Sequence, residues 1–156
     1  MIRSFTCCVI LFLLLPLGLM GQPAARKGFW PFKINRYDRE GRHHGRWKVY
    51  LPDNTTLIRD GRYKHGKERG TWRYYAADGK LRKKEFHKPK ADRFLVKIYH
   101  DNGQLEKQGW ARVVETEELI HYYWFGAWQV YDRQGRFSHT EYYVKGNEIS
   151  LRLAER

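Results

Sequence analysis

The chain has 156 residues, which is enough for one domain with a core of its own. It carries 30 Lys and Arg against 17 Asp and Glu, and its formal net charge is +13. Its two cysteines, Cys7 and Cys8, are adjacent and lie in the N-terminal apolar segment. The rest of the chain therefore offers no disulfide, no thiolate nucleophile and no cysteine ligand for a metal.

The N-terminal segment has the composition of a secretory signal peptide. One positive charge at Arg3 precedes the apolar run CCVILFLLLPLGLM, and small residues follow this run. We predict a signal helix over residues 1–21, cleavage after Gly21 or Ala25, and export to the periplasm or the medium. The alternative is a retained membrane anchor. A spanning helix needs about 20 apolar residues, however, and this run is shorter and contains a proline and a glycine.

Beyond the signal helix, we expect a linker at residues 22–36, a domain of repeated β-hairpins at 37–150 and a C-terminal tail at 151–156. The domain contains a recurring motif, G-x-x-x-G-x-W-x-x-Y, which is followed by a turn and then by Leu or Phe. Self-similarity at a period of about 20 to 50 residues is typical of repeat architectures. The positions of the motif and its turns are Gly45, Trp47, Tyr50, Gly70, Trp72, Tyr75, Gly79, Tyr99, Gly103, Gly126, Trp128, Tyr131 and Gly135.

Each copy of the motif predicts two strands and two turns. Segments such as WKVY, WRYY and WQVY are aromatic and β-branched, and ADGK, DNGQ and RQGR carry glycine where a tight hairpin needs a positive φ. A single hairpin is marginal in water, whereas stacked hairpins can cover each other's aromatic rows. We therefore predict an all-β fold, an extended antiparallel sheet of hairpins with the repeated Trp and Tyr side chains in its interior.

The G-x-W-x-x-Y…G-x-L units resemble the MORN repeat, in the variant form found in bacterial proteins, some of which are labelled as antitoxins. The resemblance extends over roughly Tyr37 to Gly146. It implies a ladder of β-hairpins that serves as a binding or scaffolding surface, with lipid or protein partners proposed for some members. A signal peptide separates the protein from a cytoplasmic toxin, so an antitoxin-like role would be directed at a secreted toxin.

No combination of residues predicts catalysis, a metal or a cofactor, and we expect that the protein is not an enzyme. Ser138 and His139 are adjacent, so on a strand their side chains should face opposite sides and should not share a proton. Glu117 and Glu118 have the same fault as an acid–base pair. The histidines are scattered without the spacing of a zinc site. They are His43, His44, His65, His87, His100, His121 and His139.

Basic and aromatic residues are interleaved most densely between residues 82 and 93. The cations of this cluster are Arg82, Lys83, Lys84, Lys88, Lys90 and Arg93. Such a surface can bind a polyanion, although the same pattern also arises when solvated charges flank buried aromatics. Export argues against nucleic acid and favours an acidic protein or an anionic envelope surface as the partner.

Three functions are consistent with these features. The first is a non-catalytic, exported repeat protein whose basic, aromatic sheet surface binds a protein or an anionic envelope partner. The second is an antitoxin-like or immunity-like protein that binds a toxin. The third is a glycan-binding or glycan-acting protein, and catalysis on a glycan would require two carboxylates that face one cleft. The sequence leaves the oligomeric state open.

Overall fold

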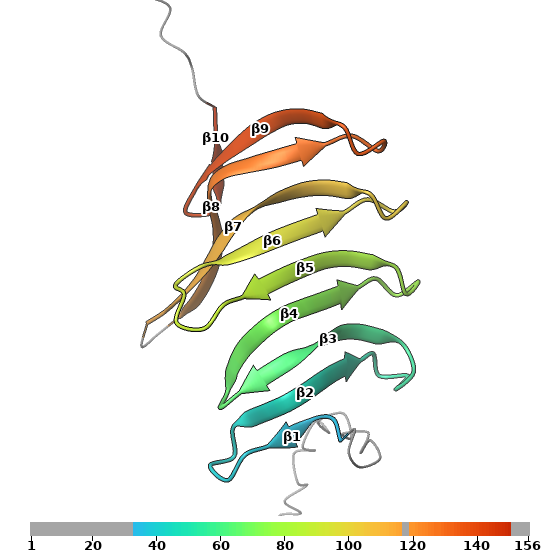
Figure 1. Cartoon of the computed structure of the whole chain (residues 1–156), viewed down its shortest axis with the longest axis vertical. Helices are drawn as coiled ribbons and strands as arrows, with labels where there is room; N and C mark the ends of the chain where they lie inside the picture. Colours follow the sequence, from blue (N-terminus) through green and yellow to red (C-terminus); the bar gives the residue numbers. More distant parts are fainter. Residues whose placement is uncertain (1–32, 117–118, 151–156) are drawn as a thin grey trace, which may run out of the picture.

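Ten antiparallel strands follow one another in chain order in a single sheet (Figure 1). This arrangement confirms the predicted all-β class and the repeat-like succession of hairpins. The strands are β1 (Arg36–Tyr37), β2 (His43–Tyr50), β3 (Leu57–Lys64), β4 (Lys67–Tyr75), β5 (Leu81–His87), β6 (Phe94–Tyr99), β7 (Leu105–Glu115), β8 (Ile120–Tyr131), β9 (Phe137–Val144) and β10 (Asn147–Ile149).

The computed structural model describes residues 33–116 and 119–150. The predicted signal helix, most of the predicted linker and the predicted C-terminal tail lie outside these ranges, as do Glu117 and Glu118. Within the described ranges, no helix has the length and apolar character that a membrane crossing requires.

Four hairpins share one irregularity at the same place. In β2–β3, β4–β5, β6–β7 and β8–β9, the register shifts beside the last tyrosine of the first strand. The second strand accommodates one extra residue there, which forms a β-bulge. The extra residues are Ile58, Arg82, Glu106 and Ser138. The repeat in the sequence is therefore also a repeat in backbone geometry.

The predicted glycine turns also form. Gly79, Gly103 and Gly135 have φ values of 79°, 84° and 80°. In each of these turns the glycine N–H donates to the carbonyl three residues earlier, at 2.9 Å. The longer LPDNTT loop places Asn54 at a φ of 56° instead, a conformation that asparagine tolerates better than most residues.

The repeated Trp and Tyr side chains do not all lie in the interior, which corrects the sequence prediction. Trp72 and Trp128 are completely buried at 0 % exposure, but Trp47 is only half-buried. We call the face that carries Trp72 and Trp128 the inner face. Tyr75 and Tyr131 follow these tryptophans by three positions, so they project from the opposite, outer face, where they are half-buried.

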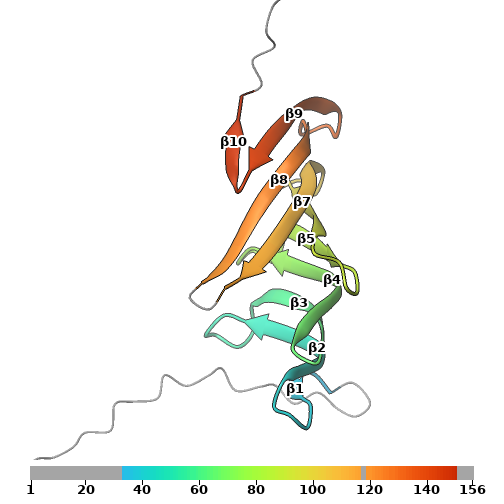
Figure 2. The same ribbon diagram turned by 90° about the vertical axis from the view of Figure 1, so that its left-hand side faces the viewer.

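Strands β7 and β8 are longer than their neighbours. Strand β6 begins at Phe94, which pairs with Ala111, so β7 beyond Ala111 pairs only with β8. The free end of this hairpin extends past β6 to the level of β4 and β5 (Figures 1 and 2). It contacts the inner face there, because Tyr122 of β8 reaches Glu85 of β5.

Candidate functional site

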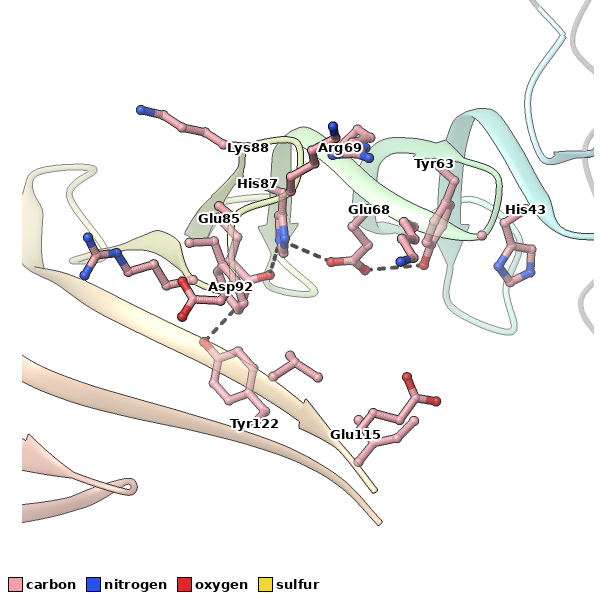
Figure 3. A pocket seen from close by; sticks show the side chains of 18 of the residues that line it. His43, Tyr63, Glu68, Arg69, Glu85, His87, Lys88, Asp92, Glu115 and Tyr122 are labelled. Atoms are coloured by element: carbon pink, nitrogen blue, oxygen red, sulfur yellow. Dashed lines mark hydrogen bonds and ion pairs between the residues drawn. The ribbon is translucent and has the colours of Figure 1, made fainter. Parts of the chain in front are cut away.

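A cleft of about 980 Å³ opens on the inner face, beside the free end of the β7–β8 hairpin (Figure 3). Strands β3, β4 and β5 contribute most of its lining, together with the loop at residues 88–93. The hairpin contributes Val113, Glu115, Ile120 and Tyr122. Seven lysines and arginines line the cleft against four carboxylates, so its walls carry an excess of positive charge.

Glu85 is the buried anion at the centre of the cleft. Its Oε1 accepts hydrogen bonds from Lys83 Nζ at 2.8 Å and from the Tyr122 hydroxyl at 3.2 Å. Its Oε2 accepts one from the Tyr74 hydroxyl at 2.6 Å and lies 3.4 Å from His87 Nε2. Burial alone would raise the pKa of Glu85, but the contacts with His87, Lys83 and Tyr74 outweigh burial and hold the pKa at about 2.

Two tyrosine hydroxyls act as permanent donors to this carboxylate. Burial raises the pKa values of Tyr74 and Tyr122, and the negative charge of Glu85 raises both further. The phenols therefore stay protonated at any physiological pH. Tyr74 belongs to β4 and Tyr122 to β8. Through these two hydrogen bonds, Glu85 of β5 connects the inner face of β4 and β5 to the free end of the β7–β8 hairpin.

A second carboxylate, Glu68 on β4, faces the same cleft. His87 Nε2 lies 3.2 Å from Glu68 Oε2, and the Arg59 guanidinium contacts Glu68 Oε1. Arg59 also lies over the ring of Trp72, with its Cζ 4.2 Å from the ring centroid. Each glutamate is thus balanced by a cation of the protein itself, Glu68 by Arg59 and Glu85 by Lys83.

Sequence reasoning missed this group, which we call the glutamate–histidine cluster and define as Glu68, Glu85 and His87. Candidate ligand atoms of the three residues lie within 4.8 Å of one another. The available signal was the E-x-H spacing of Glu85 and His87, which places both side chains on one face of a strand. The contribution of Glu68 depends on strand pairing and has no local signal.

A second group of this kind lies at the N-terminal edge of the sheet. Asp38, His44 and His65 also bring their candidate ligand atoms within 4.8 Å of one another. Arg42 already occupies this group, because its Nη2 lies 2.9 Å from Asp38 Oδ2 and 3.0 Å from His65 Nδ1. Arg42 here and Arg59 and Lys83 in the cleft supply the positive charge that a metal would bring, so we do not infer metal binding at either group.

The predicted polyanion-binding cluster divides between the two faces. Lys83, Lys88, Lys90 and Arg93 line the cleft. Arg82 forms an ion pair with Asp101, and Lys84 projects from the outer face, with its Nζ 5.3 Å from the ring centroid of Tyr99. Lys67, the first residue of β4, also lines the cleft. We call Lys67, Lys88, Lys90 and Arg93 the cleft cations.

The expectation that the Ser138 and His139 side chains face opposite sides of the strand was wrong. Ser138 Oγ lies 3.0 Å from His139 Nδ1, because Ser138 is the extra residue of a β-bulge and strict alternation fails there. His139 Nε2 lies 3.6 Å from Glu141 Oε1, which is longer than a hydrogen bond. Glu141 is already bound by Lys107 and Tyr143. The exposed serine and histidine therefore lack the oriented carboxylate of a catalytic triad.

Comparison of the chain with protein-family models, with curated proteins and with solved structures finds no match. The resemblance to the MORN repeat variant stays a prediction, and the function is inferred from the cleft itself.

Proposed function

We propose that the protein is a non-catalytic, exported binding protein of MORN-like repeats whose cleft binds an acidic segment of a partner protein. One observation carries this proposal. Lys67, Lys88, Lys90 and Arg93 line the cleft without a carboxylate partner among the described residues. The Arg93 guanidinium lies over the ring of Trp110, with its Cζ 4.9 Å from the ring centroid. Arg59 and Lys83 already neutralise the carboxylates of the glutamate–histidine cluster. The cleft cations are therefore free to pair with the carboxylates of a ligand.

The shape of the site favours a protein segment over a flat membrane surface. The cleft cations lie around a concave space, the cleft itself. The low-dielectric walls of a cleft concentrate the electric field of the charges that line it. An extended acidic segment can enter between β3–β5 and the hairpin and meet several cations. A planar bilayer would meet the projecting end of the hairpin, where Glu115 opposes an anionic surface. An immunity role against a secreted toxin would use the same cleft.

The state of Glu85 supports a binding role without catalysis. A general acid must hold a proton near neutral pH, and Glu85, with a pKa of about 2, has none to give. Its oxygens are also occupied by Lys83, Tyr74 and Tyr122, which leaves little room for a substrate proton. Glu85 therefore acts as an internal counter-ion that holds the side chains of Lys83, Tyr74 and Tyr122 in place.

A glycan ligand is the second candidate. Two carboxylates, Glu68 and Glu85, face one cleft beside the tyrosine rings of Tyr63 and Tyr122. Aromatic faces and hydrogen-bonding polar groups are what a sugar-binding site offers. A neutral oligosaccharide would use these groups without the cleft cations, which separates this candidate experimentally from the acidic segment.

The test is the binding of a fluorescently labelled poly-glutamate peptide, measured by anisotropy at two salt concentrations. A K88Q/K90Q/R93Q variant removes three cleft cations. The control, K64Q/R133Q/K145Q, removes three exposed cations that do not line the cleft. We expect the cleft variant to bind about tenfold more weakly and the control to bind like the unmodified protein. Added salt should weaken binding further.

Three results would overturn the proposal. The first is equal peptide binding by the cleft variant and the control. The second is binding of phosphatidylglycerol vesicles that exceeds peptide binding and is insensitive to the cleft substitutions, which would make a membrane surface the partner. The third is binding of a neutral chitooligosaccharide by all three proteins without peptide binding, which would favour the glycan candidate.

A further inference from the structure

Four arginines line a smaller hollow of about 300 Å³, away from the glutamate–histidine cluster. The arginines are Arg46 of β2, Arg62 of β3, and Arg69 and Arg73 of β4. Arg46, Arg62 and Arg73 are strand neighbours of inner-face positions, so they project from the outer face. Arg69 lies beside a register shift and lines both this hollow and the cleft. Asp60 is the one carboxylate in the lining of the hollow.

The arginines of this hollow are poorly compensated. Arg46 approaches the nearly buried Asp60 with Nε and Nη2, each at 3.4 Å, which is long for a charge-assisted hydrogen bond. Arg62, Arg69 and Arg73 form no ion pair with a carboxylate in the part of the chain that the structure describes, although Asp60 is the strand partner of Arg73. The Nε of Arg69 is buried and has no acceptor there. Such a donor is normally satisfied in a folded protein.

Strand pairing forces these like charges together. Arg46 is the direct partner of Arg62 across β2–β3, and Arg62 is the direct partner of Arg69 across β3–β4. Like charges that lie directly opposite each other destabilise a sheet. An anion bound between the guanidinium groups would remove this repulsion and supply the missing acceptors.

The repeat itself does not require arginines at these positions, as an internal comparison shows. The register shift that surrounds Gly61 in β3–β4 recurs around Gly109 in β7–β8. The positions equivalent to Asp60, Arg62, Arg69 and Arg73 are there occupied by Gln108, Trp110, Phe125 and Gln129. The same backbone thus forms with uncharged side chains, so the cluster of arginines belongs to this one site.

The geometry points to an oxyanion site in this hollow, for a phosphate or sulfate group. A guanidinium group donates two parallel hydrogen bonds to such an anion, and several can surround its tetrahedral oxygens. Thr71 adds a hydroxyl to the lining. Arg46, Arg62 and Arg73 do not line the inner cleft. Substitution of these arginines can therefore abolish oxyanion binding without changing the binding of an acidic segment in the cleft.

The experiment is thermal unfolding of the protein in inorganic phosphate, sulfate or pyrophosphate, against chloride at equal ionic strength. Binding to the folded state raises Tm by mass action, and we expect a rise of about 5 °C near saturation. An R62Q/R73Q variant should lose this rise. The control R39Q/R133Q, which removes two exposed arginines outside the hollow, should keep it. Without the anion, R62Q/R73Q should unfold no earlier than the unmodified protein, because the substitution of Arg62 removes its like-charge pairs with Arg46 and Arg69.

A second variant keeps the test decisive if R62Q/R73Q does not fold. R62K retains the charge but loses the planar fork, and it should bind the anion about tenfold more weakly in calorimetry. Two further ligands identify the molecule that carries the oxyanion. Vesicles of phosphatidylcholine with phosphatidic acid test a lipid headgroup, heparin tests a sulfated glycan, and both are compared with the free anion. The proposal is wrong if Tm in phosphate equals Tm in chloride, or if R62Q/R73Q responds to phosphate like the control.

Discussion

The indole of Trp72 lies flat against the backbone of Gly61 on the neighbouring strand. A Cβ on Gly61 would come within 2.1 Å of Trp72 Cδ2, well inside any van der Waals contact. The arrangement recurs between Trp128 and Gly109, where the added Cβ would lie 2.3 Å from two ring carbons. Each fully buried tryptophan of the repeat therefore packs against a glycine of the adjacent strand, and any larger residue at that glycine would clash with the indole ring.

We predict that G61A destabilises the protein by about 1–3 kcal/mol through overpacking against Trp72. Urea unfolding measures this change. A double-mutant cycle with W72L isolates the cause: W72L relieves the clash, so the two substitutions should couple by about 1 kcal/mol or more. G70A separates backbone strain from overpacking: nothing lies within 4 Å of its added Cβ, but its φ is 65°, so it should cost about 1–2 kcal/mol and should not couple to W72L. Additive effects of G61A and W72L would contradict the prediction.

Acid should destabilise the protein through Glu85. Its pKa is about 2 in the folded state and near its usual value of 4.5 in the unfolded chain. The unfolded state therefore binds more protons between these values, and stability rises with pH across this window. The contribution, about 3 kcal/mol, is fully present above pH 4.5 and is lost as the pH falls through about 2.

The E85Q variant tests this assignment. At pH 7 it should lose about 3 kcal/mol of unfolding free energy, because Lys83 and His87 keep their places beside a neutral side chain. Its stability should also change less than that of the unmodified protein between pH 4.5 and pH 2. E148Q, an exposed glutamate on β10, should leave both the stability and its pH dependence unchanged. Parallel pH profiles for E85Q and the unmodified protein would exclude Glu85 as the source.

The hairpins were predictable because their signals are local. The Asp-Gly, Asn-Gly and Gln-Gly turns and the W-x-x-Y strands each act over a few residues, and the turns at Gly79, Gly103 and Gly135 form as the sequence predicts. The faces were harder to predict. A spacing of three residues puts Trp72 and Tyr75 on opposite faces, so the two repeated rings of one motif cannot both fill one interior.

The cleft was not predictable, because it depends on contacts between distant segments. Gly61 and Gly109 lie outside the repeated motif, and their role follows from strand pairing with Trp72 and Trp128. The contact between Glu85 and Tyr122 joins residues 37 positions apart. It exists because β7 continues beyond its last pair with β6, which no local pattern in residues 105–115 indicates.

The hydroxyl of Tyr122 should hold the overhanging hairpin in place, and Y122F tests this role. The substitution removes the hydrogen bond to Glu85 and leaves the ring beside Phe94, 5.8 Å between centroids. A lost hydrogen bond of about 1 kcal/mol corresponds to about fivefold faster local opening. Amide hydrogen exchange should therefore accelerate in the hairpin end, at residues 112–116 and 119–123, while the strands β2 and β3 keep their rates.

The matched control is Y142F, because the half-exposed Tyr142 forms no hydroxyl hydrogen bond among the described residues. It should leave hairpin exchange unchanged. Equal acceleration in β2 would mean that Y122F lowers global stability, and no acceleration at residues 112–123 would mean that side-chain packing alone holds the hairpin. If the hairpin does open, Y122F should also weaken poly-glutamate binding, because the cleft loses one wall while every cleft cation remains.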